Sequence, residues 1–106
     1  SAKSLGVLIE LDQVLVHPWV IGELALGQLG AARKQVLDGL QAFQVAPIVP
    51  DDELVRFITE RRLFATGIGW LDAQLLGSTA IADATLWTRD RRQRNAARAI
   101  GVPIVN

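Results

Sequence analysis

Apolar residues recur along the chain with two different spacings, and these spacings predict which elements form. Spacings of three and four residues are typical of helices that bury one face, whereas short apolar runs between turn residues are typical of strands. By this criterion we expect helices over 18–27, 31–43, 51–58, 68–76 and 91–100, and strands over 14–16, 44–49, 84–88 and 102–105. The opening stretch 4–11, mostly apolar and followed by Asp12 and Gln13, is expected to be the end of a helix and a turn.

The alternation of strands with helices predicts the fold class. Strands separated by helices form parallel sheets whose two faces are both covered. We therefore expect an α/β fold with three layers, α/β/α, around a small parallel sheet. A chain of 106 residues is expected to form a single domain, here residues 1–106. Pro103 predicts that the last strand lies at an edge, because proline has no N–H to donate to a neighbouring strand.

Composition and charge narrow the class of protein. Half of the residues are hydrophobic and 21% are charged, which is typical of a globular chain. There is no cysteine, so disulfides and thiolate metal sites are excluded, and a cytoplasmic location is expected. No apolar run approaches the roughly 20 residues that cross a membrane.

The formal net charge is zero, but basic residues gather near the C-terminal end. Within this segment the sole acidic residue is Asp90, and its arginines are Arg89, Arg91, Arg92, Arg94 and Arg98. Such a segment is either the solvated face of a helix or a surface that contacts phosphates, and the sequence leaves both interpretations open.

Two acidic residues have apolar surroundings in the predicted helices. The helical neighbours of a side chain are three and four positions away, and for Glu23 and Asp72 all of these are apolar residues or glycine. Burying a carboxylate without a partner is unfavourable, so each acid needs an arginine, backbone donors or a cation. Structural ion pairs therefore remain an alternative to a functional site.

A third acid, Asp90, directly follows a predicted strand. The carboxyl ends of parallel strands form the ligand crevice of open α/β sheets, although an aspartate here can also cap the next helix. If Glu23, Asp72 and Asp90 converge, their oxygens suit Mg²⁺ or Mn²⁺. Such an ion assists the attack of water on a phosphodiester.

Other residues with chemical potential have simpler explanations. His17 is the one histidine of the chain, so we expect a structural role for it. Trp19, Trp70 and Trp87 all lie in apolar elements. Core packing is therefore the favoured interpretation for them, with stacking on nucleobases as the alternative.

Three segments carry a resemblance to a known family. Residues 17–27 read HPWVIGELALG, residues 67–76 read GIGWLDAQLL, and residues 86–90 read LWTRD. In this order they resemble the corresponding segments of PIN-domain ribonucleases of the VapC toxin type, and the resemblance covers essentially residues 5–105.

The resemblance implies a fold, an activity and a set of site residues. It implies a PIN-like fold and a Mg²⁺- or Mn²⁺-dependent endoribonuclease that acts on RNA, often tRNA. Glu23, Asp72 and Asp90 match the family's second, third and fourth metal-binding acids, and Thr88 matches a supporting hydroxyl. The family also implies a cognate VapB-type antitoxin and a homodimer, while the lack of a long apolar run predicts no membrane association.

One part of the family pattern has no counterpart in this sequence. The family begins with an apolar strand that ends in aspartate followed by threonine or serine, and then a helix, and nothing in residues 1–13 matches this. We therefore expect the N-terminal strand and first helix to be absent, and ribonuclease activity to be reduced or lost. The alternative is a catalytically inactive PIN-like module that binds RNA or an antitoxin.

Overall fold

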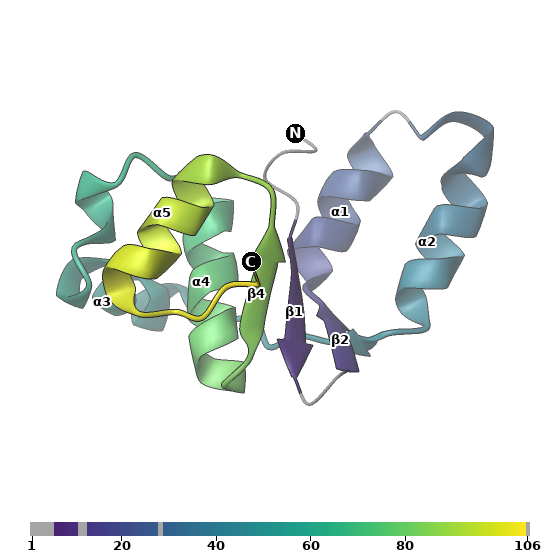
Figure 1. Ribbon diagram of the computed structural model, residues 1–106. Coiled ribbons are helices and arrows are strands. Elements are labelled where there is room, and N and C mark those ends of the chain that lie inside the picture. The colour runs from purple at the N-terminus through teal and green to yellow at the C-terminus, as the bar shows by residue number, and fades with distance from the viewer. Residues whose placement is uncertain (1–5, 11–12, 28, 106) are drawn as a thin grey trace.

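A computed structural model describes residues 6–10, 13–27 and 29–105 (Figure 1). Short 3₁₀ turns lie at Gly30–Ala32 and Leu63–Ala65. The helices are α1 (Pro18–Leu26), α2 (Arg33–Gln41), α3 (Asp51–Glu60), α4 (Trp70–Ala82) and α5 (Arg91–Ile100), and the strands are β1 (Gly6–Glu10), β2 (Gln13–Val16), β3 (Gln44–Val45) and β4 (Thr85–Thr88). Within these residues, none of the helices combines the length and the apolar character that crossing a bilayer requires.

The helical pattern of the sequence is confirmed in all five places, with small differences at the ends. Helix α4 continues through Gly77, where a Cβ atom would approach Val49 Cγ2 to 3.2 Å and Leu54 Cδ1 to 3.3 Å. The glycine therefore allows α3 and α4 to pack closely. The strand expected over 102–105 is reduced to a single parallel bridge between Leu86 and Ile104.

The first strand corrects two expectations. The sheet order is β3-β2-β1-β4, and β1 is antiparallel to both of its neighbours, so the sheet is mixed and the prediction of a wholly parallel sheet was wrong. Strands β2, β3 and β4 do run in one direction, as expected. The prediction of a helix end over 4–11 was also wrong for Gly6–Glu10, while residues 4, 5, 11 and 12 lie outside the described residues.

Residues Gly6–Glu10 form a strand because of the neighbours of β1 in the sheet, which the local sequence does not reveal. A short apolar run fits a buried helix or a central strand equally well. Leu8 lies opposite Leu15 on one side and Leu86 on the other, and it is completely buried. Pairing on both edges satisfies backbone groups of β1, β2 and β4 that would otherwise lack partners.

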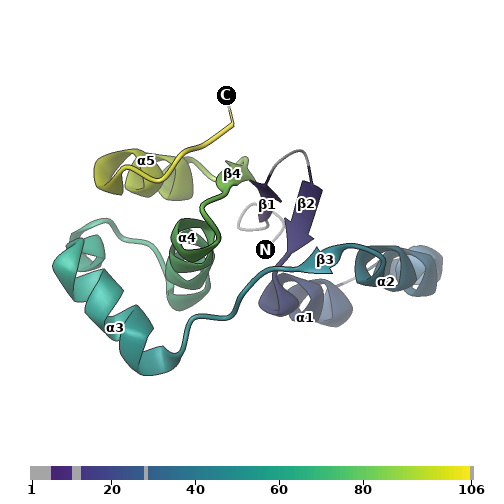
Figure 2. The ribbon, with the colours of Figure 1, turned by 90° about the horizontal axis from the view of Figure 1, so that it is seen from below.

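The core lies on one face of this sheet. Leu8, Leu15 and Leu86 share a hydrophobic cluster with buried residues of α1, α4 and α5. Figure 2 shows α1 and α4 on the same side of the strands. The α/β class is thus confirmed, and the centre of this face is buried under helices.

The opposite face of the sheet is less enclosed. Val7 and Trp87 lie side by side on it, and the Trp87 side chain is 39% exposed, so its expected place in the core was wrong. On the same face Ile9, Val14 and Thr85 are partly buried, Val16 is buried, and Val45 beside it in β3 is exposed.

A buried glutamine joins the two halves of the chain. The Gln74 amide donates to the Val49 carbonyl oxygen at 3.1 Å, and its Oε1 accepts from the Val49 N–H at 2.6 Å. The same Oε1 lies 3.1 Å from His17 Nε2. Gln74 on α4 therefore holds both the start of α1 and the segment that leads into α3.

His17 completes this network and confirms the expected structural role. Its Nδ1 accepts a hydrogen bond from the Trp19 N–H at 3.0 Å and so caps α1. Because Nδ1 accepts, the ring proton must be on Nε2, where it is donated to Gln74. Burial lowers the pKa of His17 below its ordinary value of 6.5, while the hydrogen bond with Gln74 acts in the opposite direction.

We expect Gln74→Leu to destabilise the protein strongly. The substitution leaves the buried Val49 N–H and carbonyl and the His17 Nε2–H without partners, which should lower the free energy of unfolding by about 3 kcal/mol. Urea denaturation followed by circular dichroism measures the change. The matched control is Gln35→Leu on the exposed surface of α2, which should change stability by less than about 0.5 kcal/mol. Equal effects of the two substitutions would contradict the role of Gln74.

We also expect stability to fall as the pH drops below 6.5. Since the pKa of His17 is lower in the folded state, the unfolded chain binds more protons in this range, and protonation of Nδ1 opposes the cap of α1. The control is His17→Asn, whose side chain can still accept from the Trp19 N–H but does not titrate. Unfolding midpoints between pH 7.5 and pH 5 should fall more steeply for the wild-type protein than for this variant, and parallel slopes would refute the prediction.

Candidate metal centre

Asp72 lies in the first turn of α4 and has one oxygen without a partner. Its Oδ2 accepts from the Gly69 N–H at 3.4 Å, in a capping arrangement at the helix start. Its Oδ1 is buried and accepts no hydrogen bond. Such an atom calls for an explanation, because buried polar atoms in folded proteins nearly always have partners.

Asp90 lies at the junction of β4 and α5 and caps that helix. Its Oδ1 accepts from the backbone N–H groups of Arg92 at 2.9 Å and Gln93 at 3.3 Å. Its own N–H donates to Thr88 Oγ1 at 3.1 Å. The capping role is therefore present, and the Thr88 hydroxyl helps to fix the backbone on which the Asp90 carboxylate is carried.

The fold brings the carboxylates of Asp72 and Asp90 close enough to affect each other. Burial raises the pKa of Asp72 above its ordinary value of 3.8, the hydrogen bond from Gly69 opposes this shift, and the negative charge of Asp90 adds to it. Two like charges in a partly buried place repel each other, and a proton or a cation relieves the repulsion.

Gln93 joins the two elements that carry these acids, and the sequence analysis missed it. This side chain is completely buried on α5, and its Nε2 lies 3.4 Å from the Asp72 carbonyl oxygen. Its Oε1 is buried without a hydrogen-bond partner, like Asp72 Oδ1. Its spacing from Ala96 and Ala97, which are also buried, places it on the inner face of an otherwise arginine-rich helix. That spacing was the available signal.

Glu23 does not complete a group of three acids in the described part of the chain. Within residues 6–10, 13–27 and 29–105 there is no cluster of three or more acidic or histidine side chains that could hold a metal ion. Glu23 is exposed, whereas its apolar helical neighbours had suggested a buried position. Its helix is nevertheless held against α4, because the Trp19 and Trp70 rings are 6.5 Å apart and His17 contacts Gln74. The role of Glu23 stays a prediction.

Asp72 and Asp90 are residues that could hold a divalent cation. Magnesium is usually bound in proteins by one or two carboxylates, with water and substrate phosphates as the remaining ligands. A buried, unpartnered Asp72 Oδ1 near a second carboxylate is a donor set of this kind. Elsewhere, Lys34 and Asp38 form an ion pair at 2.8 Å on the surface of α2.

The arginines around Asp90 divide into structural and exposed ones. Arg94 Nη1 donates to the Thr88 carbonyl at 3.3 Å and the Val105 carbonyl at 3.1 Å, so it ties α5 to β4. Arg89 lies 5.7 Å from the centroid of the Trp87 ring. Arg91 and Arg92 directly follow Asp90 in the sequence and are exposed.

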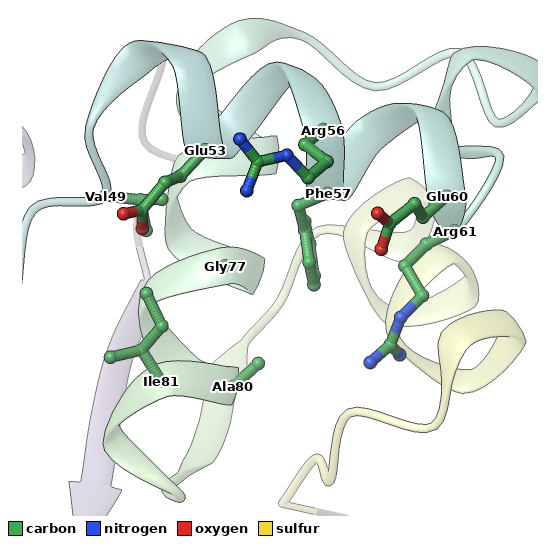
Figure 3. A pocket seen from close by; sticks show the side chains of 9 residues that line it. All are labelled: Val49, Glu53, Arg56, Phe57, Glu60, Arg61, Gly77, Ala80 and Ile81. Carbon is green, nitrogen blue, oxygen red and sulfur yellow. The ribbon is translucent and has the colours of Figure 1, made fainter.

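A hollow between α3 and α4 lies away from this centre (Figure 3). It has a volume of about 240 Å³ and includes Gly77, Ala80 and Ile81, in the second half of α4. Two acids and two arginines, Glu53, Glu60, Arg56 and Arg61, line it, so their formal charges cancel. It therefore offers no electrostatic preference for a polyanion.

Two curated proteins are similar to this chain. Both are called ribonuclease VapC32, from Mycobacterium tuberculosis strains CDC 1551 / Oshkosh and ATCC 25618 / H37Rv. Each is 45% identical over 101 residues, which is 92% of this chain and 81% of the relative. No family model and no solved structure matches the chain.

We expect Asp72→Asn to leave the metal-free protein as stable as the wild type, or to stabilise it. The pKa of Asp72 is raised by folding, so its charged form opposes folding at neutral pH, and asparagine can still accept from the Gly69 N–H. Thermal unfolding in EDTA at pH 7.5 tests this. In contrast, Asp38→Asn removes the ion pair with Lys34 and should cost up to about 0.5 kcal/mol. A clear loss of stability in Asp72→Asn would show that Asp72 belongs to a structural network.

Proposed function

Because the chain belongs to the VapC family of PIN-domain ribonucleases, we propose that it is a Mg²⁺- or Mn²⁺-dependent endoribonuclease whose metal-binding acids are Asp72, Asp90 and Glu23. The observation that carries the proposal is the buried Asp72 Oδ1, which accepts no hydrogen bond and lies near the Asp90 charge.

The roles of the residues follow from their contacts. When bound, Mg²⁺ or Mn²⁺ supplies positive charge to the scissile phosphate and lowers the pKa of water. Asp72 and Asp90 provide the anionic oxygens, and Thr88 holds the Asp90 backbone. Gln93 keeps the first turn of α4 beside α5, so it positions Asp72 without contacting the substrate.

The substrate and partners follow from the same proposal. The exposed guanidinium groups of Arg91 and Arg92 suit the phosphates of RNA, and a tRNA loop is the kind of substrate that the family suggests. A VapB-type antitoxin would block the acidic pair, and a homodimer is the expected assembly.

A specific observation also favours the second candidate function, a module that binds RNA or an antitoxin without cleaving. Among the described residues, the acids form a pair and no group of three. Fewer protein ligands weaken the binding of a divalent ion and loosen its geometry. The two candidates differ in what Mn²⁺ does to the protein.

If the enzymatic proposal is correct, Mn²⁺ at a hundred times its dissociation constant should stabilise the protein by about 2.7 kcal/mol and support cleavage of single-stranded RNA. Asp72→Asn should abolish this stabilisation and reduce cleavage at least about 100-fold, as expected when several kcal/mol of charge stabilisation are lost. Thermal unfolding and gel electrophoresis of labelled RNA are the measurements, with Asp38→Asn as the control. RNA binding without Mn²⁺ binding or cleavage would instead establish the non-catalytic module.

The remaining acid and the positioning residue are tested separately. Glu23→Gln should reduce cleavage if Glu23 is the third acid, and should leave it unchanged if the pair acts alone. Gln93→Leu should weaken Mn²⁺ binding about 10- to 100-fold, the range for residues that orient metal ligands. A loss of overall stability in Gln93→Leu, with Mn²⁺ binding unchanged, would reduce its role to packing.

A further inference from the structure

The start of α4 exposes aromatic surface that the proposed metal centre does not use. Trp70 is the first residue of α4, and its side chain is 42% exposed. Phe64, in the 3₁₀ turn that precedes this helix, is 66% exposed. Large aromatic side chains bury extensive apolar area in folded proteins, so two exposed rings beside one hollow indicate a surface that meets a ligand.

These two rings border a hollow of about 200 Å³. Its other apolar lining residues are Ile58, Leu63, Ile68 and Ala73. The volume is smaller than the 300–1,000 Å³ that is typical of pockets for drug-sized molecules, so one or two flat rings are the largest group that fits.

The Trp70 ring has a rigid support behind it. It lies 6.5 Å from the Trp19 ring with an angle of 32° between their planes, and Trp19 in turn meets His17 edge to face at 5.7 Å. His17 is completely buried and is hydrogen-bonded to Gln74. A ring held in this way loses little freedom when a second ring stacks on it, which favours binding.

One positively charged side chain lies at the edge of the hollow. The guanidinium of Arg62 lies 5.9 Å from the centroid of the Phe64 ring. The residues that line the hollow include no charged side chain. A group that enters it therefore inserts an apolar, planar part between the rings and leaves its negative charge beside Arg62. An unpaired nucleobase with its phosphate has this distribution, since every base has a face that stacks and a phosphate that pairs with arginine.

We propose that the hollow between Phe64 and Trp70 is a subsite for one unpaired nucleobase of a single-stranded RNA that flanks the phosphate at Asp72. This proposal rests on the proposed ribonuclease function and adds how the substrate is held. Trp70 and Asp72 are two residues apart on the first turn of α4, so they face different sides of one helix end about 10–12 Å in diameter. The hollow and the phosphate at Asp72 are therefore separated by about one helix diameter, which neighbouring nucleotides of one strand would have to span around the end of α4.

The test measures RNA binding without cleavage. A fluorescently labelled octaribonucleotide is titrated in EDTA, and its affinity is followed by anisotropy. We expect Trp70→Ala and Phe64→Ala each to weaken binding about ten-fold, as alanine substitution of base-stacking residues does, and Trp70→Phe to retain most of the affinity. The control is Phe43→Ala, which removes a ring 46% exposed between α2 and β3 and should leave affinity unchanged.

An oligonucleotide with abasic sites separates base contacts from phosphate contacts. If the subsite holds a base, the abasic RNA should bind the wild-type protein and Trp70→Ala equally. Wild-type affinity in both alanine variants, or an equal loss on intact and abasic RNA, would overturn the subsite and leave the ribonuclease proposal standing. Absence of RNA binding by the wild-type protein, together with absence of cleavage in Mn²⁺, would overturn both.

Discussion

The hydrogen bonds of Gln74 are the constraint on which the arrangement of this molecule depends. One buried amide uses both of its polar atoms on the Val49 backbone and shares its oxygen with His17. Because His17 also begins α1, the directions of α1, of the segment before α3 and of α4 are set at one point. All three residues are buried, and hydrogen bonds are stronger in the low dielectric of a protein interior than in water. These hydrogen bonds also fix the position of the candidate site, because Asp72 lies two residues before Gln74 on the same helix.

Sequence patterns predicted the parts of the fold in which local and global preferences agree. The helices from Pro18 to Ile100 combine apolar positions at helical spacing with turn residues between the helices, and all five appear. The segment Gly6–Glu10 lacks such agreement, because its apolar run is compatible with two structures. Leu15 and Leu86 decide the outcome by packing against Leu8, and such long-range contacts cannot be read from a local pattern.

The sequence also predicted the candidate site only where local patterns were sufficient. Asp72 and Asp90 were visible because their surroundings offered no obvious partner or placed them at a strand end. The exposure of Glu23 could not be predicted from the sequence. Helix α1 packs through few of its described residues, and Val20 is the one that is buried. Gln93 escaped notice because a glutamine among arginines looks like surface, and its burial follows from the tertiary position of α5.

The same features explain why a stable chain tolerates an unfavourable carboxylate. The raised pKa of Asp72 means that the fold opposes its charge, and carboxylates with raised pKa values are common at functional sites of proteins. The unfavourable effect of the Asp72 charge is confined to the first turn of α4. The next residues of this helix are completely buried, namely Gln74, Leu75 and Leu76. Helix α4 therefore combines a first turn that exposes Trp70 and holds an unpaired acid with a middle section that secures the core. A ligand that neutralises Asp72 and covers Trp70 would remove the two least favourable features of that turn together.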